Sequence, residues 1–323
     1  MKESILNFSK QFGFRPQISN SDNFKKNNYK NFVLGGMGGS HLPAKILKSY
    51  NPSISLQIHS DYGIPQYSDD YYKETLFIAS SYSGNTEETI DFLDEAYSRG
   101  FATFVISTGG KLIDFAEKNN IPYIKIPNTG IQPRVAVGFS TIALASIVTP
   151  DCLNELFELE KTINPSKYEK EGNQLSESLN QKIPVIYTAN SDNAIGYIWK
   201  IKINETAKIP CFQNEFPELN HNEMQSYDFV DANRNLSEKF HLLIIKDSDE
   251  DSRISNRMSV LEKLFEEKGI PVTSIYMEGS GRFEKIFNSI ILSDWCSLGL
   301  ANLYGVNPEK VDFIEEFKKR ISQ

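Results

Sequence analysis

Hydroxyl side chains and a glycine gather in residues 80–89, whose sequence is SSYSGNTEET. The segment follows an apolar run, 75–79, that predicts a buried strand, and it precedes a periodic run, 86–100, that predicts a helix. Backbone N–H groups at a helix start are unpaired, and the helix dipole places partial positive charge there. With serine and threonine donors added, this turn is suited to a phosphate dianion. It contains no lysine, so it is not a phosphate loop of the Walker type.

A second turn, 35–40 (GGMGGS), is rich in glycine and lies between a predicted strand and a predicted helix. Glycines permit a tight turn and a close approach of the backbone to a ligand. The spacing does not match Gly-x-Gly-x-x-Gly, and Gln57, His59 and Ser60 occupy the region where a dinucleotide site needs an acidic residue. A nicotinamide oxidoreductase is therefore disfavoured, while a tight turn without a ligand remains an alternative.

The bulk composition indicates a soluble cytoplasmic protein. The 323 residues are enough for two domains, and the formal net charge of −8 argues against a nucleic-acid-binding surface. The three cysteines, Cys152, Cys211 and Cys296, lack metal-ligand spacing, so neither a metal site nor a disulfide framework is predicted. The N-terminus has no signal-peptide pattern, and no apolar run approaches the ~18 residues of a membrane span, so we expect no membrane association.

Strand and helix patterns alternate along both halves of the chain. Strands are predicted at 31–35, 53–59, 75–80, 102–107 and 122–126, and again at 183–188, 240–245 and 271–276. Helices are predicted between them, the later ones at 193–208, 252–268, 282–304 and 308–320, with Pro308 at the first position of the last. The alternation predicts an α/β fold of two domains, 1–152 and 153–323, each a doubly wound, mainly parallel sheet flanked by helices. The polar stretch 163–180 is the predicted linker, and its one weak pattern is that of an amphipathic helix. Only the first domain has a turn suited to phosphate.

Five segments, which occur in a fixed order, resemble a known enzyme family. They are 36–40 (GMGGS), 80–89, Pro133-Arg134, 204–208 (NETAK) and 214–223 (NEFPELNHNE). Together they resemble the bifunctional phosphoglucose/phosphomannose isomerases, which belong to the sugar isomerase (SIS) domain superfamily. The serine-rich segment alone would indicate only a SIS domain, so the resemblance depends on all five segments. It implies two SIS-type domains.

The resemblance implies a cofactor-free homodimeric enzyme that interconverts glucose 6-phosphate and fructose 6-phosphate, with mannose 6-phosphate as a further substrate. By motif matching, the implied phosphate ligands are Ser40, Ser81, Ser83 and Thr86, and the implied substrate loop contains Gly38, Gly39 and Pro133. The implied catalytic residues are Glu205 as base, Arg134 facing the enediolate, and His221 and Lys318 in ring opening. In such dimers the histidine reaches the site of the neighbouring subunit.

These residue types suit the implied chemistry. Moving a carbonyl group between C1 and C2 requires removing a proton α to a carbonyl and returning it to the adjacent carbon, which one carboxylate can do. An arginine is always charged and stabilises a developing oxyanion. Hexose phosphates are mostly cyclic, and a histidine can exchange protons near neutral pH to open the ring.

Each candidate also has a structural interpretation. Glu205 could be a solvated residue beside the apolar face of its helix, and Arg134, in the apolar region 131–142, could form a salt bridge. His221 could be a capping or surface histidine. The remaining histidines are interpreted as structural: His41, His59 and His241.

The C-terminal region bears on the ring-opening lysine and on the substrate. Lys318 lies near a helix C-terminus, where basic residues are favoured, but its helical phase predicts an inward position beside Ile314 and Ile321. The segment before this helix, 307–311 (NPEKV), departs from the DPTPV of many family members. A threonine there is associated with use of the mannose epimer, so its absence puts the phosphomannose activity in doubt more than the phosphoglucose activity.

Two other functions remain as alternatives. A SIS module that senses a sugar phosphate and controls a partner needs the hydroxyl groups, but it does not need Glu205, His221 and Arg134 together. A SIS isomerase for an amino-sugar or pentose phosphate is disfavoured by the two fused halves and by the NHNE sequence at 220–223.

Overall fold

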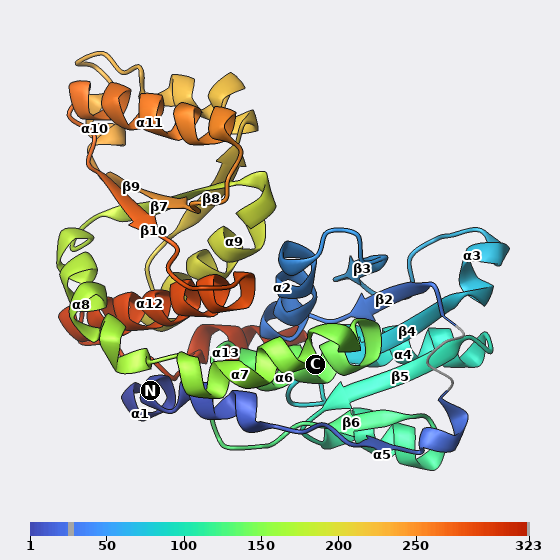
Figure 1. Cartoon of the computed structure of the whole chain (residues 1–323). Coiled ribbons are helices and arrows are strands. Elements are labelled where there is room, and N and C mark those ends of the chain that lie inside the picture. Colours follow the sequence, from blue (N-terminus) through green and yellow to red (C-terminus); the bar gives the residue numbers. More distant parts are fainter. Residues whose placement is uncertain (25–28, 322–323) are drawn as a thin grey trace. The chain divides into compact units, whose positions relative to one another are not determined.

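The computed structural model describes residues 1–24 and 29–321, and its internal contacts divide the chain into two compact units (Figure 1). The N-terminal unit comprises Asn7–Ile163, and the C-terminal unit combines Met1–Leu6 with Asn164–Gln323. The division falls later in the chain than the predicted boundary between residues 152 and 153.

Helix α7 (Leu153–Thr162) accounts for this difference in the boundary. It packs against the 3₁₀ segment η1 (Phe8–Gly13) and against helix α6 (Val137–Val148), both of which belong to the N-terminal unit. Leu156 and Leu159 of α7 are buried there. The apolar stripe of this helix therefore ties it to the unit that precedes it.

The N-terminal unit is built on a mainly parallel sheet with the strand order β1-β6-β5-β4-β2-β3. The strands are β1 (Ile18–Ser19), β2 (Asn31–Gly35), β3 (Leu56–His59), β4 (Thr75–Ser80), β5 (Ala102–Ser107) and β6 (Tyr123–Lys125). The described strand pairs are parallel except for β1 with β6. β4 is buried along its whole length, as its continuous apolar run predicts for a central parallel strand.

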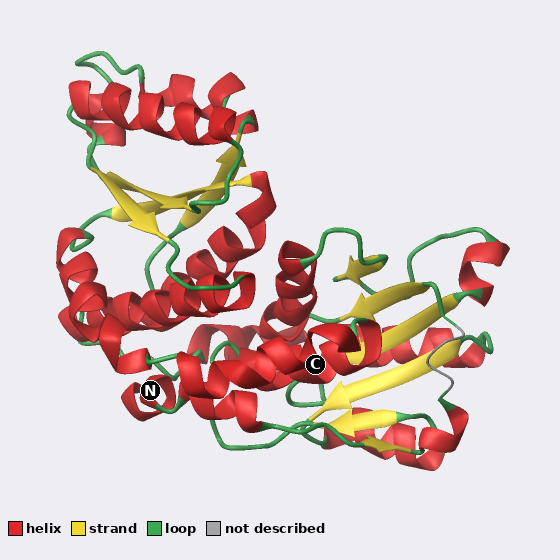
Figure 2. Ribbon diagram, in the orientation of Figure 1, coloured by secondary structure: helices red, strands yellow, loops and turns green. Residues whose placement is uncertain are grey.

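Helices flank this sheet (Figure 2). They are α2 (Leu42–Tyr50), α3 (Asp69–Lys73), α4 (Glu87–Ser98), α5 (Gly110–Lys118), α6 and α7. Phe92 of α4 and Leu112 of α5 share a core cluster with Phe77 of β4, whereas α2 packs against α6. The predicted α/β fold with a mainly parallel sheet flanked by helices is confirmed for this unit.

The C-terminal unit has a parallel sheet with the strand order β10-β9-β7-β8. The strands are β7 (Ile183–Ala189), β8 (Phe212–Phe216), β9 (Phe240–Lys246) and β10 (Val272–Tyr276). The helices are α1 (Lys2–Leu6), α8 (Glu169–Ser178), α9 (Asn193–Lys202), α10 (Arg234–Ser237), α11 (Ser252–Glu267), α12 (Arg282–Leu303) and α13 (Asp312–Ile321). α10 and α11 lie on one side of the sheet, and α9 and α12 lie on the other (Figure 1). The predicted fold class is confirmed here as well.

The predicted linker 163–180 contains the expected amphipathic helix. It forms a 3₁₀ segment, η6 (Pro165–Tyr168), and then helix α8. Leu175 is buried, and a Cβ atom at Gly172 would lie 2.3 Å from Trp295 Cβ of α12. This segment is polar because only one face of α8 packs on α12, while the other faces solvent.

Two further elements differ from the sequence-based prediction. The last helix begins at Asp312 and not at Pro308, because the Asn307 side-chain oxygen accepts from Glu309 N at 2.9 Å and holds residues 307–310 in a turn. Strand β8 has no predicted counterpart, since its sequence FQNEF lacks both an apolar run and a full alternation.

Helix α12 corrects the expectation that no apolar run approaches bilayer length. It has 22 residues, and its best 18-residue window has a mean hydropathy of 1.2, so length and composition alone would allow a membrane span. Of that window, 89% is buried inside the structure, where α12 packs against α8 and α9. The apolar residues of α12 are thus part of the core of the C-terminal unit.

Candidate active site

The N-terminal sheet has a topological switch point between β2 and β4: from β2 the chain continues to β3 on one side, and from β4 it continues to β5 on the other. Doubly wound sheets bind ligands at the carboxyl ends of the strands at such a point. The loops at 36–40 and 81–86 follow these two strands, and they contact each other. Tyr82 N donates to Ser40 Oγ at 3.0 Å, and Ser80 Oγ donates to the Ser40 carbonyl oxygen at 3.1 Å. We call this place the N-terminal crevice.

The hydroxyl groups of Ser81 and Thr86 form a cluster in the N-terminal crevice. Ser81 Oγ lies 2.8 Å from Thr86 Oγ1 and accepts from Gly84 N at 3.2 Å. Ser83 Oγ accepts from Asn85 N at 3.3 Å. Thr86 is the N-cap residue of α4, so the cluster lies at a helix start, where the dipole favours an anion.

Two glycines lie in close contacts with the backbone at this crevice. Gly84 has φ +72°, and a Cβ atom there would lie 1.8 Å from the Gly109 carbonyl oxygen. A Cβ atom at Gly39 would lie 3.2 Å from Arg134 N and 3.3 Å from Pro133 Cβ. The glycine-rich loop and the Pro133-Arg134 turn are therefore in direct contact.

Arg134 is a buried cation beside the glycine-rich loop. Its exposed fraction is 2%, and its Nη1 lies 3.5 Å from Gln132 Oε1. A guanidinium keeps its charge when buried, so it contributes positive potential to the crevice. The N-terminal unit thus holds the predicted phosphate ligands on two loops that contact each other, and the backbone of Arg134 lies beside the glycine-rich loop.

His41 directly follows Ser40, at the end of the 3₁₀ segment η4 (Gly38–His41), in which Gly38 has a left-handed φ of +52°. Burial lowers the pKa of His41 to about 4, and the positive charge of Lys45 acts in the same direction. The imidazole is therefore neutral at pH 7 and adds no charge to the N-terminal crevice. This agrees with the structural role predicted for His41.

Glu205 lies in the C-terminal unit, on a π-helical turn, Ile203–Ala207 (η8), that continues α9. The predicted helix 193–208 is thus α-helical only as far as Lys202. Trp199 and Ile203 are buried as predicted, and Glu205 is half-buried. π-helical turns are frequent at functional sites, and this one gives Glu205 a direction that a regular helix would not.

His221 is exposed at the end of a 3₁₀ segment, η9 (Glu218–His221), that follows β8. The carboxylate of Glu223 fixes this loop by accepting from Tyr187 Oη on β7 and from Asn214 Nδ2 on β8, both at 2.6 Å. Burial raises the pKa of Tyr187, so its hydroxyl stays a donor. Sequence reasoning missed this role of Glu223, because its partners lie on strands that are distant in sequence or were not predicted.

Glu205 and His221 of one chain lie at opposite ends of β8. Glu205 precedes the strand, and Asn204 Nδ2 holds the intervening loop by donating to the Ile209 carbonyl oxygen at 2.9 Å. His221 follows the strand. The five residues of β8 span roughly 16 Å, so the two side chains originate at opposite edges of the sheet.

Lys318 does not have the predicted inward orientation. It lies on α13, every described residue of which is exposed, and its Nζ pairs with Glu315 Oε1 at 2.9 Å. Phe317 is 61% exposed and Ile314 is 41% exposed. The helix has the apolar stripe that the sequence predicts, but that stripe does not pack into the core of its unit.

The C-terminal sheet also has a topological switch point, between β7 and β9, and ion pairs lie at the carboxyl ends of these two strands. We call this place the C-terminal crevice. Arg282 pairs with Asp192, which follows β7, and with Asp247, which follows β9. Lys285 pairs with Asp247 at 2.6 Å. Burial raises the pKa of Asp192, and the charge of Arg282 opposes that shift.

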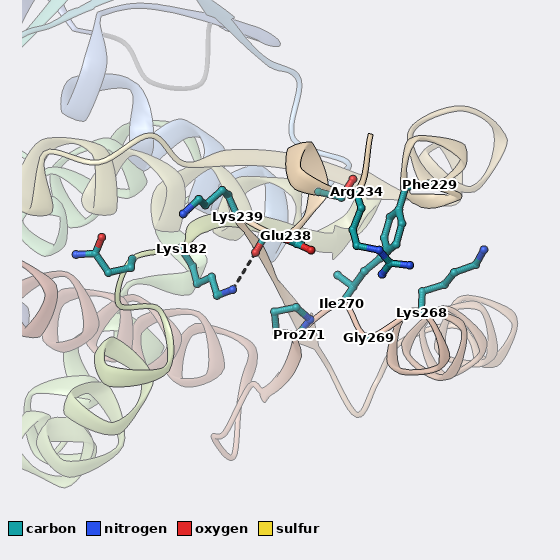
Figure 3. Close-up of a pocket in the computed structure, with 11 residues that line it drawn as sticks. Lys182, Phe229, Arg234, Glu238, Lys239, Lys268, Gly269, Ile270 and Pro271 are labelled. Carbon is teal, nitrogen blue, oxygen red and sulfur yellow. Dashed lines mark hydrogen bonds between the residues drawn. The ribbon is translucent and has the colours of Figure 1, made fainter. Parts of the chain in front are cut away.

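A pocket of about 440 Å³ opens at the amino ends of β7, β9 and β10 (Figure 3). Cations predominate at its rim, and two of them contact groups of the protein itself. Lys182 Nζ donates to the Glu238 carbonyl oxygen at 2.8 Å, and the Arg234 guanidinium lies 4.6 Å from the centre of the Phe229 ring. The described residues that line it include none of the predicted site residues.

Metal-binding side chains do not gather in the described part of the chain. Among residues 1–24 and 29–321, no group of three or more His, Cys, Asp or Glu residues is placed to hold a metal ion. The three cysteines are free and buried, and burial raises the pKa of the Cys152 thiol to about 11. A protonated, buried thiol is neither a good nucleophile nor a metal ligand.

Comparison with known proteins identifies relatives along the whole chain. Residues 168–321 match the family described as the bacterial phospho-glucose isomerase C-terminal SIS domain. The chain is 32% identical to a bifunctional phosphoglucose/phosphomannose isomerase of Caldicellulosiruptor bescii, over 100% of this chain and 99% of the relative. It is 34% identical to a protein of the same name from Thermoplasma volcanium, over 95% of this chain and 97% of the relative.

A solved structure shares the fold. Tagatose-6-phosphate ketose/aldose isomerase from Escherichia coli has a TM-score of 0.67 and 14% sequence identity, over 95% of this chain and 94% of that one. At this identity the likeness concerns the fold alone. The sequence relatives are far closer and are matched over nearly their full length. The chain therefore belongs to the bifunctional phosphoglucose/phosphomannose isomerase family.

Proposed function

We propose that this protein is an aldose–ketose isomerase that interconverts glucose 6-phosphate and fructose 6-phosphate through a cis-enediolate. One observation carries the proposal within this family. The chain combines a hydroxyl-lined helix start, at the N-terminal crevice, with a half-buried carboxylate, Glu205, on a π-helical turn. A protein that only senses a sugar phosphate would need the first feature and not the second.

In this proposal the N-terminal unit binds the phosphate group of the substrate. The ligands are Ser40, Ser81, Ser83 and Thr86, together with backbone N–H groups at the start of α4. The glycine-rich loop with Gly38 and Gly39, and the Pro133 turn beside it, let the backbone approach the sugar closely. Phosphate binding is remote from the reacting carbons, so its free energy orients the substrate for reaction.

Glu205 carries the isomerisation. Its carboxylate takes the proton from the carbon next to the carbonyl group of the open-chain sugar, which leaves an enediolate and a neutral Glu205. Glu205, whose proton exchanges with solvent, then protonates the former carbonyl carbon. The hydroxyl proton of the deprotonated carbon moves to the former carbonyl oxygen, so no proton or electron is gained overall. Arg134 stabilises the negative charge on the enediolate oxygen. His221 and Lys318 move protons during ring opening.

The position of His221 supports a homodimer with shared sites. Because Glu205 and His221 of one chain originate at opposite ends of β8, His221 of the partner subunit is the better candidate to act with Glu205. A mixture of Glu205→Gln and His221→Asn proteins tests this. Shared sites give heterodimers with one intact site, and about a quarter of the wild-type activity returns on random exchange. Sites made within one chain give no recovery.

Mannose 6-phosphate is the weaker substrate in this proposal. Residues 307–311 lack the threonine that many family members have, and Asn307 instead closes a turn by accepting from Glu309 N. We expect a lower kcat/KM for mannose 6-phosphate than for glucose 6-phosphate. Equal values would show that the NPEKV sequence does not affect epimer use.

A coupled assay tests the proposed function directly. Purified, folded protein is supplied with fructose 6-phosphate, and glucose 6-phosphate is detected with a dehydrogenase. Turnover is expected without added metal or cofactor. The proposed location of the protein is the cytoplasm, where hexose phosphates occur. A protein that binds fructose 6-phosphate and does not convert it would favour the sensor, and conversion of only another sugar phosphate would favour a different isomerase.

A further inference from the structure

Lys208 has an unusual backbone conformation directly after the turn that carries Glu205. Its φ is 61° and its ψ is 32°, in the left-handed region that glycine and asparagine adopt far more readily than lysine. A lysine that ends a helix in this way loses stability that a glycine would keep. The side chain of Lys208 must therefore contribute something that glycine cannot.

The ammonium group of Lys208 connects two segments of the C-terminal unit. Nζ donates to the Glu205 carbonyl oxygen and, at 2.5 Å, to the Lys310 carbonyl oxygen. An ammonium group has three donors, so one cation can serve both acceptors. Lys310 lies in the turn that leads into α13, the helix that carries Lys318. Lys208 thus joins the backbone of Glu205 to the segment that precedes Lys318.

The other side of the π-helical turn is fixed by buried groups. Lys202, one turn before Glu205, is fully buried and pairs with Asp294 of α12 at 2.5 Å. Asn204 holds the following loop through the Ile209 carbonyl oxygen. These contacts hold the start of the π-helical turn against the core. Lys208 holds the end of that turn against the segment before α13. The direction of Glu205 depends on both anchors.

We propose that Lys208 is a positioning residue for the isomerisation, which rests on the proposed role of Glu205. It holds the π-helical turn and the segment before α13 in one fixed arrangement. Small displacements of a catalytic group lower the rate of a positioned reaction strongly. Loss of the Lys208 side chain should therefore lower kcat and leave substrate binding nearly unchanged, because the phosphate ligands lie in the N-terminal unit.

The test uses Lys208→Gly, which keeps the left-handed conformation and removes the ammonium group. We expect kcat to fall about tenfold or more, KM to stay within about threefold, and the melting temperature to stay equal or rise. Lys208→Arg should recover most of the activity, because a guanidinium can also donate to two carbonyl oxygens. The matched control is Gln181→Gly, another left-handed residue of this unit with φ 61°, which should leave kcat unchanged.

A double variant separates positioning from a general structural role. In the Glu205→Gln background, Lys208→Gly should change the residual turnover by less than about twofold, because its effect acts through Glu205. Wild-type kcat in Lys208→Gly would overturn the proposal. So would a loss of kcat that is accompanied by a matching loss of melting temperature, or by a full additional loss in the double variant. Inactive wild-type protein would instead overturn the proposed function.

Discussion

The N-terminal and C-terminal crevices share a topology and differ in chemistry. In the N-terminal crevice, β2 and β4 lead into glycine and hydroxyl residues at the start of α4. In the C-terminal crevice, β7 and β9 lead into Asp192 and Asp247, which Arg282 holds together. The N-terminal crevice offers hydrogen-bond donors and positive potential to an anion. In the C-terminal crevice the carboxylates are already paired with cations of the protein. The strand order creates a switch point in each sheet, and the side chains there determine whether it can bind a ligand.

The C-terminal unit carries its candidate chemistry outside its crevice. Glu205 lies on a π-helical turn before β8, and Lys208 joins this turn to the segment before α13 by donating to the Lys310 carbonyl oxygen. The ion pairs of the crevice stabilise the unit, and the turn presents the carboxylate. We therefore propose that the N-terminal crevice binds the substrate phosphate, that the C-terminal crevice stabilises its unit, and that the π-helical turn with Glu205 carries out the reaction. The predictions below test these three assignments.

The largest expected effect is on reaction. Glu205→Gln should lower kcat by about 10³-fold, because the amide cannot accept the proton, and fructose 6-phosphate should still bind within about threefold of the wild-type affinity. Steady-state kinetics and titration calorimetry measure the two quantities. Glu266→Gln, an exposed change on α11, is the control. Unchanged turnover in Glu205→Gln would remove this residue from the role of base.

The next effect concerns the stability of the C-terminal crevice. Arg282→Met should lower the free energy of unfolding by about 3 kcal/mol, because it leaves the buried carboxylates of Asp192 and Asp247 short of a partner. Urea denaturation measures the change. Arg253→Met, which removes an exposed ion pair with Asp251, should have little effect. A raised KM without a loss of stability would show that the C-terminal crevice binds substrate.

A smaller effect depends on pH in the N-terminal crevice. The pKa of His41 is lowered to about 4, so between its ordinary value of 6.5 and about 4 the unfolded chain binds a proton that the folded chain does not. Stability should therefore fall with decreasing pH in this window, by roughly 2–3 kcal/mol from this residue. His41→Gln should reduce that slope in urea denaturation measured from pH 7 to pH 4. An unaltered slope would contradict the buried, neutral histidine.

The smallest effect is on phosphate binding. Thr86→Val removes one hydroxyl of the cluster without changing its shape, and it should raise KM about tenfold with little change in kcat. The control is Ser191→Ala, at the corresponding turn after β7, which should leave KM unchanged. Equal KM values for Thr86→Val and Ser191→Ala would remove the distinction between the two crevices.

The sequence predicted most of the fold because the strands that matter are continuous apolar runs. β4 and β9 are found this way, and the long helices α4, α11 and α12 have clear periodicity. β8 could not be found, since an edge strand with the sequence FQNEF gains its stability from pairing with β7. The amphipathic helix predicted within 163–180 is present as α8, but its polar composition did not reveal that it packs on α12, because only one face of the helix is apolar.

The candidate site was predicted in part. The loops at 36–40 and 81–86 follow from motifs at strand ends, and Arg134 follows from the family resemblance. The structure places the two loops in contact, with the Arg134 backbone beside the glycine-rich loop. The π-helical turn under Glu205 could not be predicted, because its apolar residues continue the period of α9. The contacts of Lys208 and Glu223 depend on partners that are distant in sequence, which no spacing reveals.

The most direct test of the account is the source of the hydrogen at C2 of the product. The protein is supplied with fructose 6-phosphate in D₂O, and the glucose 6-phosphate formed is examined by ¹H NMR spectroscopy. A carboxylate that exchanges its proton with solvent places deuterium at C2, so the account predicts deuterium in the wild-type product and no comparable turnover by Glu205→Gln. Product that contains only protium, formed equally fast by wild-type protein and by Glu205→Gln, would contradict the account.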